Sequence, residues 1–114
     1  MLKSDWIRLR HMLDAAKEAR SFIKNEERAS IEKDRKLVLA LIKSIEIIGE
    51  AANKVTKECR ESIPQIPWPN IINMRNRLIH AYFDINLDIL WETVNVDIPG
   101  LIEKLEKILP SNEI

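Results

Sequence analysis

An apolar residue recurs every three or four positions through the middle of this 114-residue chain. Residues three and four apart share one face of an α-helix, so the spacing predicts a helix with a continuous apolar stripe. Its members are Leu37, Leu41, Ile45, Ile48, Ala52 and Val55. We predict that this helix is long, that Ser30 caps its start, and that it lies at the centre of the fold.

Two other segments repeat the spacing. The first follows the cap candidates Ser4 and Asp5 and ends at the charged turn "NEERAS". The last follows "DIN" and contains Pro99, which we expect to kink or divide the helix near residues 95–98. The stripes consist of Trp6, Leu9, Leu13, Ala16, Ala19 and Ile23 in the first segment, and of Leu87, Leu90, Trp91, Val94, Ile98, Leu101, Leu105 and Ile108 in the last.

A proline-rich connection, "IPQIPWPN", cannot be helix interior, because proline lacks the N–H that a helix needs. Its last proline, Pro69, suits the first turn of a further helix that would run to about Tyr82. Two glycines in the chain, with 32% charged and 46% hydrophobic residues, are typical of a mostly helical protein. We predict an all-α fold, an antiparallel bundle of four main helices that forms one domain over residues 1–114.

Composition limits the function classes. Eighteen basic and eighteen acidic side chains cancel, so any nucleic-acid site must be local. Cys59 is the only cysteine and cannot form an internal disulfide, and the N-terminal segment lacks the apolar core of a signal peptide. No apolar run approaches the roughly 20 residues that cross a bilayer. We therefore expect a cytoplasmic protein that does not associate with a membrane.

The segment "MRNRLIHAYF", residues 74–83, places Arg75, Asn76, His80 and the only tyrosine, Tyr82, among apolar residues. On a helical wheel these four polar residues border the second of two apolar faces. The first face consists of Ile71, Met74, Leu78 and Ala81, and the second of Ile72, Ile79 and Phe83. A small monomer has little left to cover both faces, so we predict a homodimer that packs on the second.

A simpler interpretation of this segment gives it no chemistry. Arg75 and Arg77 are then solvated, His80 is a satisfied and partly buried histidine, and Tyr82 packs as an ordinary amphipathic side chain. Against this interpretation, the polar residues lie beside a predicted interface and are of the types that phosphate chemistry requires.

Metal-free RNA cleavage needs a base for the 2′-hydroxyl, an acid for the leaving 5′-oxygen and a cation for the charged transition state. Histidine, with an ordinary pKa of about 6.5, serves as acid or base, and arginine binds phosphate through a planar fork. A dimer supplies two copies of His80 and of Arg75 around one cleft. The Asn76 amide is suited to hold a phosphate or the imidazole.

Other catalytic constellations are weaker. Cys59 lies in the charged segment "KECRES" with no histidine nearby, which disfavours a catalytic nucleophile. His11 and His80 lie in different predicted helices without ligands at metal-binding spacing, and Gly49 and Gly100 stand alone, so neither a metal nor a phosphate-binding loop is expected.

Glu46 and Glu50 lie one turn apart on the central predicted helix. They have two interpretations. Either they orient Arg75, or they are an ordinary pair of carboxylates on a solvated face, and the second interpretation is favoured.

"MRNRLIHAYF" also contains the pattern R-x4-H-x-Y, with Asn directly after the Arg, and in this it resembles HepT-like proteins of the HEPN superfamily. These are small, all-helical toxins of bacterial and archaeal toxin–antitoxin pairs. The segments "IEIIGEAANKV", "IPWPNIINMRN" and "LWETVNVDIPGL" are similar to the corresponding segments of that family, so the resemblance covers the chain from about residue 37 onward.

The resemblance implies a homodimeric, metal-independent endoribonuclease with a composite active site at the dimer interface and no cofactor. Arg75 and His80 would be catalytic and Asn76 would support them. It also implies a partner, a minimal nucleotidyltransferase that acts as antitoxin in a type VII toxin–antitoxin system. This enzyme would transfer AMP from ATP onto Tyr82, where the added negative charge and bulk would repel RNA.

Two alternatives remain open at this stage. The first is a non-catalytic helical module that binds a nucleotidyltransferase or a nucleotide, which zero net charge suits equally well. The second is a purely structural dimeric bundle, against which the clustering of the four polar residues argues.

Overall fold

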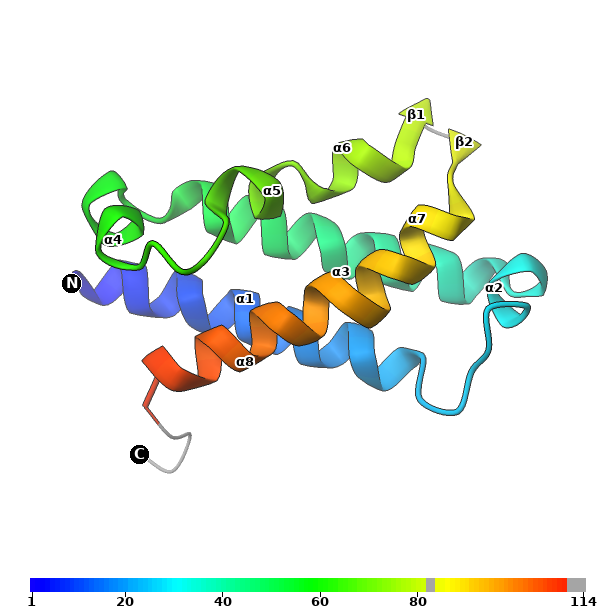
Figure 1. The fold of residues 1–114 in the computed structure, drawn as a ribbon, viewed down its shortest axis with the longest axis horizontal. Coiled ribbons are helices and arrows are strands. Elements are labelled where there is room, and N and C mark those ends of the chain that lie inside the picture. The colour runs from blue at the N-terminus through cyan, green and yellow to red at the C-terminus, as the bar shows by residue number, and fades with distance from the viewer. Residues whose placement is uncertain (82–83, 111–114) are drawn as a thin grey trace.

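Two long antiparallel helices form the centre of the molecule in the computed structural model, which describes residues 1–81 and 84–110, with only the main chain at 80 and 81. They are α1 (Lys3–Phe22) and α3 (Arg35–Lys54) (Figure 1). Their connection contains Asn25 in the left-handed region, with φ 65°, which asparagine tolerates, and then the short helix α2 (Ser30–Lys33).

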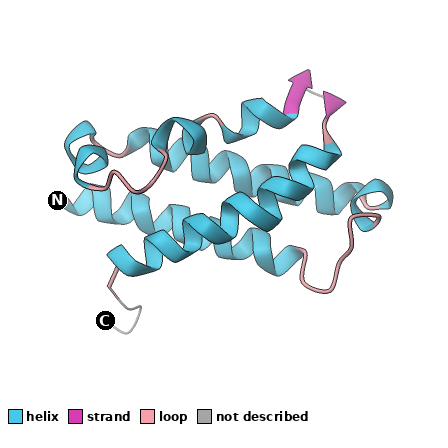
Figure 2. Ribbon diagram, in the orientation of Figure 1, coloured by secondary structure: helices cyan, strands magenta, loops and turns pink. Residues whose placement is uncertain are grey.

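A third long rod crosses in front of this pair (Figure 1). It consists of α7 (Leu87–Glu92), the π-helical turn η1 (Thr93–Asp97) and α8 (Ile98–Ile108). Figure 2 shows the three parts as one continuous helical ribbon. The predicted kink or division near Pro99 takes the form of this π-helical turn, which divides α7 from α8 without a break in the helical path. Proline lacks an N–H and its ring collides with the carbonyl four residues before it, and the wider π-helical turn separates these groups.

The fourth helical region is a series of short pieces that lie above this rod in the view of Figure 1. These are α4 (Lys57–Ser62), α5 (Trp68–Ile72) and α6 (Met74–Leu78). Pro69 lies in the first turn of α5, as predicted. An antiparallel hairpin of β1 (Ile79–Ala81) and β2 (Asp84–Ile85) then leads into α7.

The core lies where the predicted stripes meet. All six members of the α3 stripe are buried, as are five of the six in α1, while Trp6 is half-buried. In the third rod, formed by α7, η1 and α8, the buried members of the predicted stripe are Leu90, Val94, Ile98, Leu101 and Leu105. These contacts confirm the prediction of an all-α helical fold, with the small hairpin as an unpredicted addition. Among the described residues, no helix is both long enough and apolar enough to cross a membrane.

Two predicted helix starts are wrong. The long central helix begins at Arg35, because the carboxylate of Asp34 accepts a hydrogen bond from the Leu37 amide at 3.1 Å and caps it. Ser30 instead begins the separate helix α2, and its hydroxyl accepts from the Glu27 amide. Helix α1 begins at Lys3, so Asp5 lies inside its first turn and has another role.

The predicted helix from Pro69 to Tyr82 is also wrong in two places. It breaks at Asn73, whose amide N–H bonds back to Pro69 and which separates α5 from α6. It then ends at Leu78, because Ile79 is extended and the Leu78 carbonyl accepts a hydrogen bond from the Asn86 amide at 2.7 Å. The helical wheel therefore holds only as far as Leu78, and Ile79 belongs to a strand.

Asp5 joins the start of α1 to Thr56, which follows the end of α3. Asp5 is 2% exposed, and its carboxylate accepts hydrogen bonds from the Thr56 amide at 2.9 Å and the Thr56 hydroxyl at 2.7 Å. The same hydroxyl caps α4 by accepting from the Cys59 amide. Burial alone raises the pKa of Asp5, but the hydrogen bonds from Thr56 and the Leu2 main chain outweigh it and lower the pKa below its ordinary value.

Asp5 should therefore stabilise the fold only while it is ionised. Because its pKa is lowered on folding, this contribution is complete above the ordinary value of 3.8 and disappears as the pH falls through the lower folded value. We expect Asp5→Asn to reduce the free energy of unfolding at pH 7 by about 1–3 kcal/mol. Urea denaturation of both proteins at several pH values measures this.

The matched control is Asp14→Asn, an exposed position on the same helix, which should change stability little. The interpretation of Asp5 fails if the difference between Asp5→Asn and the wild type is as large at pH 2.5 as at pH 7.

Candidate functional site

Arg75 lies against the central helix. Its Nε donates to Oε2 of Glu46 at 2.6 Å, which joins α6 to the middle of α3. The Arg75 side chain remains 42% exposed and that of Glu46 27% exposed. The sequence left two interpretations open for Glu46 and Glu50. Glu46 contacts Arg75, as the interpretation that it orients the arginine requires. Glu50 is exposed, as expected for a carboxylate on a solvated face. The guanidinium is held at Nε, and the Arg75 side chain as a whole is partly exposed to solvent.

This ion pair borders a cleft of about 370 Å³ between α3 and the α5–α6 segment. Arg75 and Asn76 both line it, so the structure brings together two of the predicted site residues. Isoleucine side chains from both sides contribute apolar surface, and the polar groups surround it. The complete lining is Ile45, Glu46, Gly49, Glu50, Asn53, Ile72, Arg75 and Asn76.

Gly49 allows the two sides of the cleft to approach. A Cβ atom built on it would lie 3.2 Å from the carbonyl oxygen of Ile72 and 3.6 Å from that of Ile71. Both atoms belong to the main chain of α5, which cannot move aside as a flexible side chain can. The absence of a side chain at this position therefore sets the spacing between α3 and α5, and with it the reach from Glu46 to Arg75.

His80 follows α6 on strand β1 rather than on a helix. Its side chain and the whole of Tyr82 lie outside the described residues, so the predictions for them stay predictions. The base of the hairpin is described. The Leu78 carbonyl accepts from the Asn86 amide, and the side-chain oxygen of Asn86 accepts from the Ile89 amide at 3.0 Å and caps α7.

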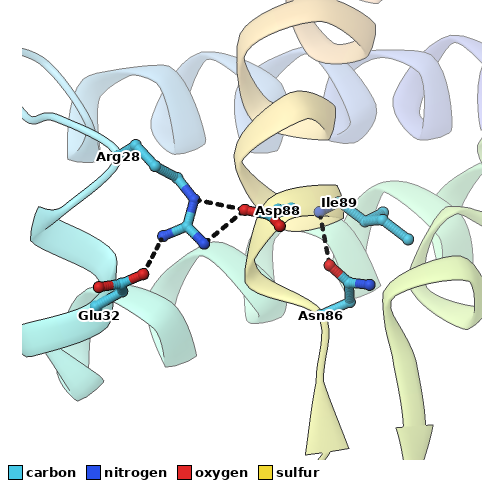
Figure 3. A network of polar contacts seen from close by, with 5 residues as sticks. All are labelled: Arg28, Glu32, Asn86, Asp88 and Ile89. Atoms are coloured by element: carbon cyan, nitrogen blue, oxygen red, sulfur yellow. Dashed lines mark hydrogen bonds and ion pairs between the residues drawn. The ribbon is translucent and has the colours of Figure 1, made fainter.

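A charged network anchors the helix that follows the hairpin (Figure 3). Arg28, from the connection after α1, donates through Nε and Nη2 to one oxygen of Asp88, at 3.0 and 2.7 Å, and through Nη1 to Glu32 at 3.3 Å. Asp88 lies in the first turn of α7, where a carboxylate also complements the helix dipole. Asp88 is 86% exposed, so the network orients the chain more than it stabilises the fold.

Arg77 points to a different part of the surface from Arg75. Its Nη2 pairs with Asp97 of η1 at 2.8 Å, and both residues line a second depression with Gly100 and Lys104. Across the bundle, Arg20 donates to the Val94 carbonyl at 3.1 Å and to the Asn95 side chain at 2.9 Å. The π-helical turn is thus held from two sides, and Arg77 is paired rather than merely solvated.

Cys59 is buried and unsuited to nucleophilic chemistry. Burial raises its pKa, and the negative charge of Asp5 raises it further, so the reactive thiolate is disfavoured. His11 is exposed on α1, beside Trp6 and Ile7, and away from the Arg75 cleft. Among the described side chains, those of residues 1–79 and 84–110, no three His, Cys, Asp or Glu side chains gather as a metal site would require.

The polar side of α3 is the part of the site that sequence patterns described least well. Glu46, Gly49, Glu50 and Asn53 follow a three-and-four spacing of their own, on a different side from the apolar stripe. Such a second stripe on a largely buried helix predicts a surface that another segment or a ligand contacts. The identity of that segment depends on the long-range contact with α5 and α6, which spacing does not reveal.

Comparison with known proteins identifies one family. Residues 12–108 match the family described as "Ribonuclease HepT-like". A protein of Thermococcus cleftensis, named "Probable ribonuclease HepT", is 44% identical over 75 residues, which cover 66% of this chain and 68% of that protein. No solved structure matches the chain significantly.

Two other relatives have RNase names. One, from Caldanaerobacter subterraneus subsp. tengcongensis, is 46% identical over 77 residues, covering 68% of this chain and 69% of that protein. The other, from Methanocaldococcus jannaschii, is 36% identical over 93 residues, covering 82% and 77% respectively. Both are named "Putative RNase".

Proposed function

Because the chain belongs to the HepT-like ribonuclease family, we propose that it cleaves RNA at a site built around Arg75 and His80. The observation that carries the proposal is the pairing of Arg75 with Glu46 at the edge of an open cleft. A guanidinium held in this way is a fixed cation at a solvent-accessible surface, which is what binding a phosphate requires. His80 follows it on the next element of the chain.

The proposed reaction is an internal transesterification without a metal. A base takes the proton from a ribose 2′-hydroxyl, and the 2′-oxygen forms a bond to the adjacent phosphorus. The bond from phosphorus to the 5′-oxygen breaks, and an acid returns a proton to this leaving oxygen. The products are a 2′,3′-cyclic phosphate and a 5′-hydroxyl, and the proposed enzyme is an endoribonuclease that makes this cut within the RNA chain. Arg75 stabilises the extra negative charge on the phosphoryl oxygens.

A composite site in a homodimer supplies the two proton-transfer groups. One chain provides one His80, whereas base and acid require two groups, so a second copy completes the site. Ile72 beside the cleft and Ile79 at the start of the hairpin are both half-buried, which leaves apolar surface for that copy to cover. Asn76 lines the cleft beside Arg75 and supports the bound phosphate.

The proposal extends to control of the activity. In the cytoplasm, the chain would be the toxin of a type VII pair, and a minimal nucleotidyltransferase would be its antitoxin. Transfer of AMP from ATP onto Tyr82 joins the phenol oxygen to the α-phosphorus and releases pyrophosphate. Tyr82 lies two residues after His80, so the added charge would repel an RNA phosphate from the site.

Replacement of His80 tests the nuclease. We expect the purified protein to cleave a mixed pool of cellular RNA in the presence of EDTA, and His80→Ala to slow cleavage by at least about 100-fold, because it removes the proton-transfer group. Gel electrophoresis of labelled RNA measures the rate. His11→Ala, at an exposed site on α1, is the matched control and should retain wild-type activity.

Cleavage that continues unchanged in His80→Ala would contradict the proposed site. A wild-type protein that cleaves no RNA but binds a nucleotidyltransferase would favour the non-catalytic module instead.

The only tyrosine makes the proposed modification easy to localise. We expect incubation with ATP and a nucleotidyltransferase encoded beside this chain to increase the protein mass by one or more AMP units and to suppress RNA cleavage. Tyr82→Phe should show neither effect, because it removes the acceptor hydroxyl. Intact-protein mass spectrometry gives the result, and a mass increase that persists in Tyr82→Phe would exclude Tyr82 as the acceptor.

A further inference from the structure

We propose that Glu46 is a positioning residue for Arg75, and that it turns the guanidinium so that the terminal nitrogens face the RNA phosphate. This inference rests on the proposed ribonuclease function. Glu46, on the central helix, would affect the reaction by positioning Arg75 and not by touching RNA itself.

The atoms in contact indicate how the guanidinium of Arg75 is oriented. A guanidinium has five N–H donors, one on Nε and four on the two terminal nitrogens. Glu46 accepts from Nε at 2.6 Å. The end formed by Nη1 and Nη2 is the fork that can make two parallel hydrogen bonds to a phosphate. A carboxylate on Nε therefore fixes the orientation of the fork and does not itself occupy the fork.

Arg75 needs such an anchor because of where it lies in the chain. Helix α6 has five residues, with the break at Asn73 before it and the extended residue Ile79 after it. A single turn of helix is marginally stable by itself and cannot hold a long side chain in place. Helix α3 has 20 residues and a buried face, so a side chain in its middle is a rigid support. Gly49, one turn along, keeps the two segments close enough for the contact.

The exposure of the pair argues against a purely structural role. Ion pairs whose side chains are partly exposed to water, here 42% for Arg75 and 27% for Glu46, contribute modestly to stability. Removal of Glu46 should therefore leave the fold intact, so a loss of activity will report on the site. The opposite role is blocking, in which Glu46 competes with the phosphate for Arg75. Blocking predicts the opposite result, because removal of a competing carboxylate strengthens RNA binding.

Steady-state cleavage separates these roles. We expect Glu46→Ala to lower kcat by about 10- to 100-fold with a smaller change in KM, since a misplaced catalytic group costs rates of this order. Glu46→Gln keeps an acceptor oxygen and should retain more activity than Glu46→Ala. If Arg75 is already replaced by alanine, the further change Glu46→Ala should alter kcat by less than about 2-fold, because the two residues act as one unit.

Two other carboxylates serve as controls. Glu50→Ala removes a negative charge one turn away in the same cleft and should lower kcat less than Glu46→Ala does. Glu103→Ala breaks an exposed ion pair with Lys107 on α8, far along the chain from the site, and should leave cleavage unchanged. An equal loss from Glu50→Ala and Glu46→Ala would overturn positioning in favour of a general charge effect.

A measurement without RNA tests the contact by itself. The Arg75 Nε–H signal in a ¹⁵N NMR spectrum should exchange slowly with water in the wild type and in Glu50→Ala, and rapidly in Glu46→Ala. If this pattern holds but the wild type cleaves no RNA, the proposed function fails and the positioning role fails with it. If the wild type cleaves RNA and Glu46→Ala cleaves equally fast or faster, positioning alone is overturned.

Discussion

The main chains of α3 and α5 approach so closely at Gly49 that no side chain fits between them without movement of the backbone. This contact determines how the rest of the site is arranged. Helix α5 leads directly into α6, which carries Arg75, so the distance between α3 and α5 also sets the distance from α3 to Arg75. At that spacing, Glu46 and Arg75 form an ion pair of 2.6 Å.

Helix α3 consequently has two functions on two sides. Its apolar stripe packs against α1 and holds the core together. On another side it contacts α5 and α6, two segments that are too short to be stable alone (Figure 1). Local elements of this kind can carry reactive groups close to solvent while the long helix keeps them in position. The hairpin that follows α6 is fixed at its base by Asn86, and Arg28 anchors the start of α7.

The sequence predicted the elements that depend on periodicity and not those that depend on distant contacts. The stripes of α1, α3 and α8, the all-α class and the division near Pro99 all follow from local spacing and from the chemistry of proline. The helix through Tyr82 was a wrong prediction, because apolar spacing alone does not reveal that Asn86 would bond to the Leu78 carbonyl. Ser30 and Asp34 are both acceptable caps, and the structure uses Asp34 for the long helix.

The residues of the candidate site were likewise predictable from the sequence only in part. The pattern from Arg75 to Tyr82 was visible at once, since its residue types and order carry the family resemblance. Glu46 remained ambiguous, because two glutamates one turn apart are common on exposed helices. Only the position of α6 shows which of them meets Arg75. The arrangement of His80 and Tyr82 around the cleft stays a prediction from the sequence.

The free energy of unfolding of Gly49→Ala, compared with that of Gly100→Ala, tests the close approach most directly. Both glycines lie within helices, where alanine is ordinarily more stable by about 0.5–1 kcal/mol. A Cβ atom at Gly100 meets nothing within 4 Å, so Gly100→Ala should be stabilised by this amount. Gly49→Ala should instead be less stable than the wild type, because the main chain of α5 must move. Equal stabilisation of the two variants in urea denaturation would contradict the claim that this contact sets the geometry of the site.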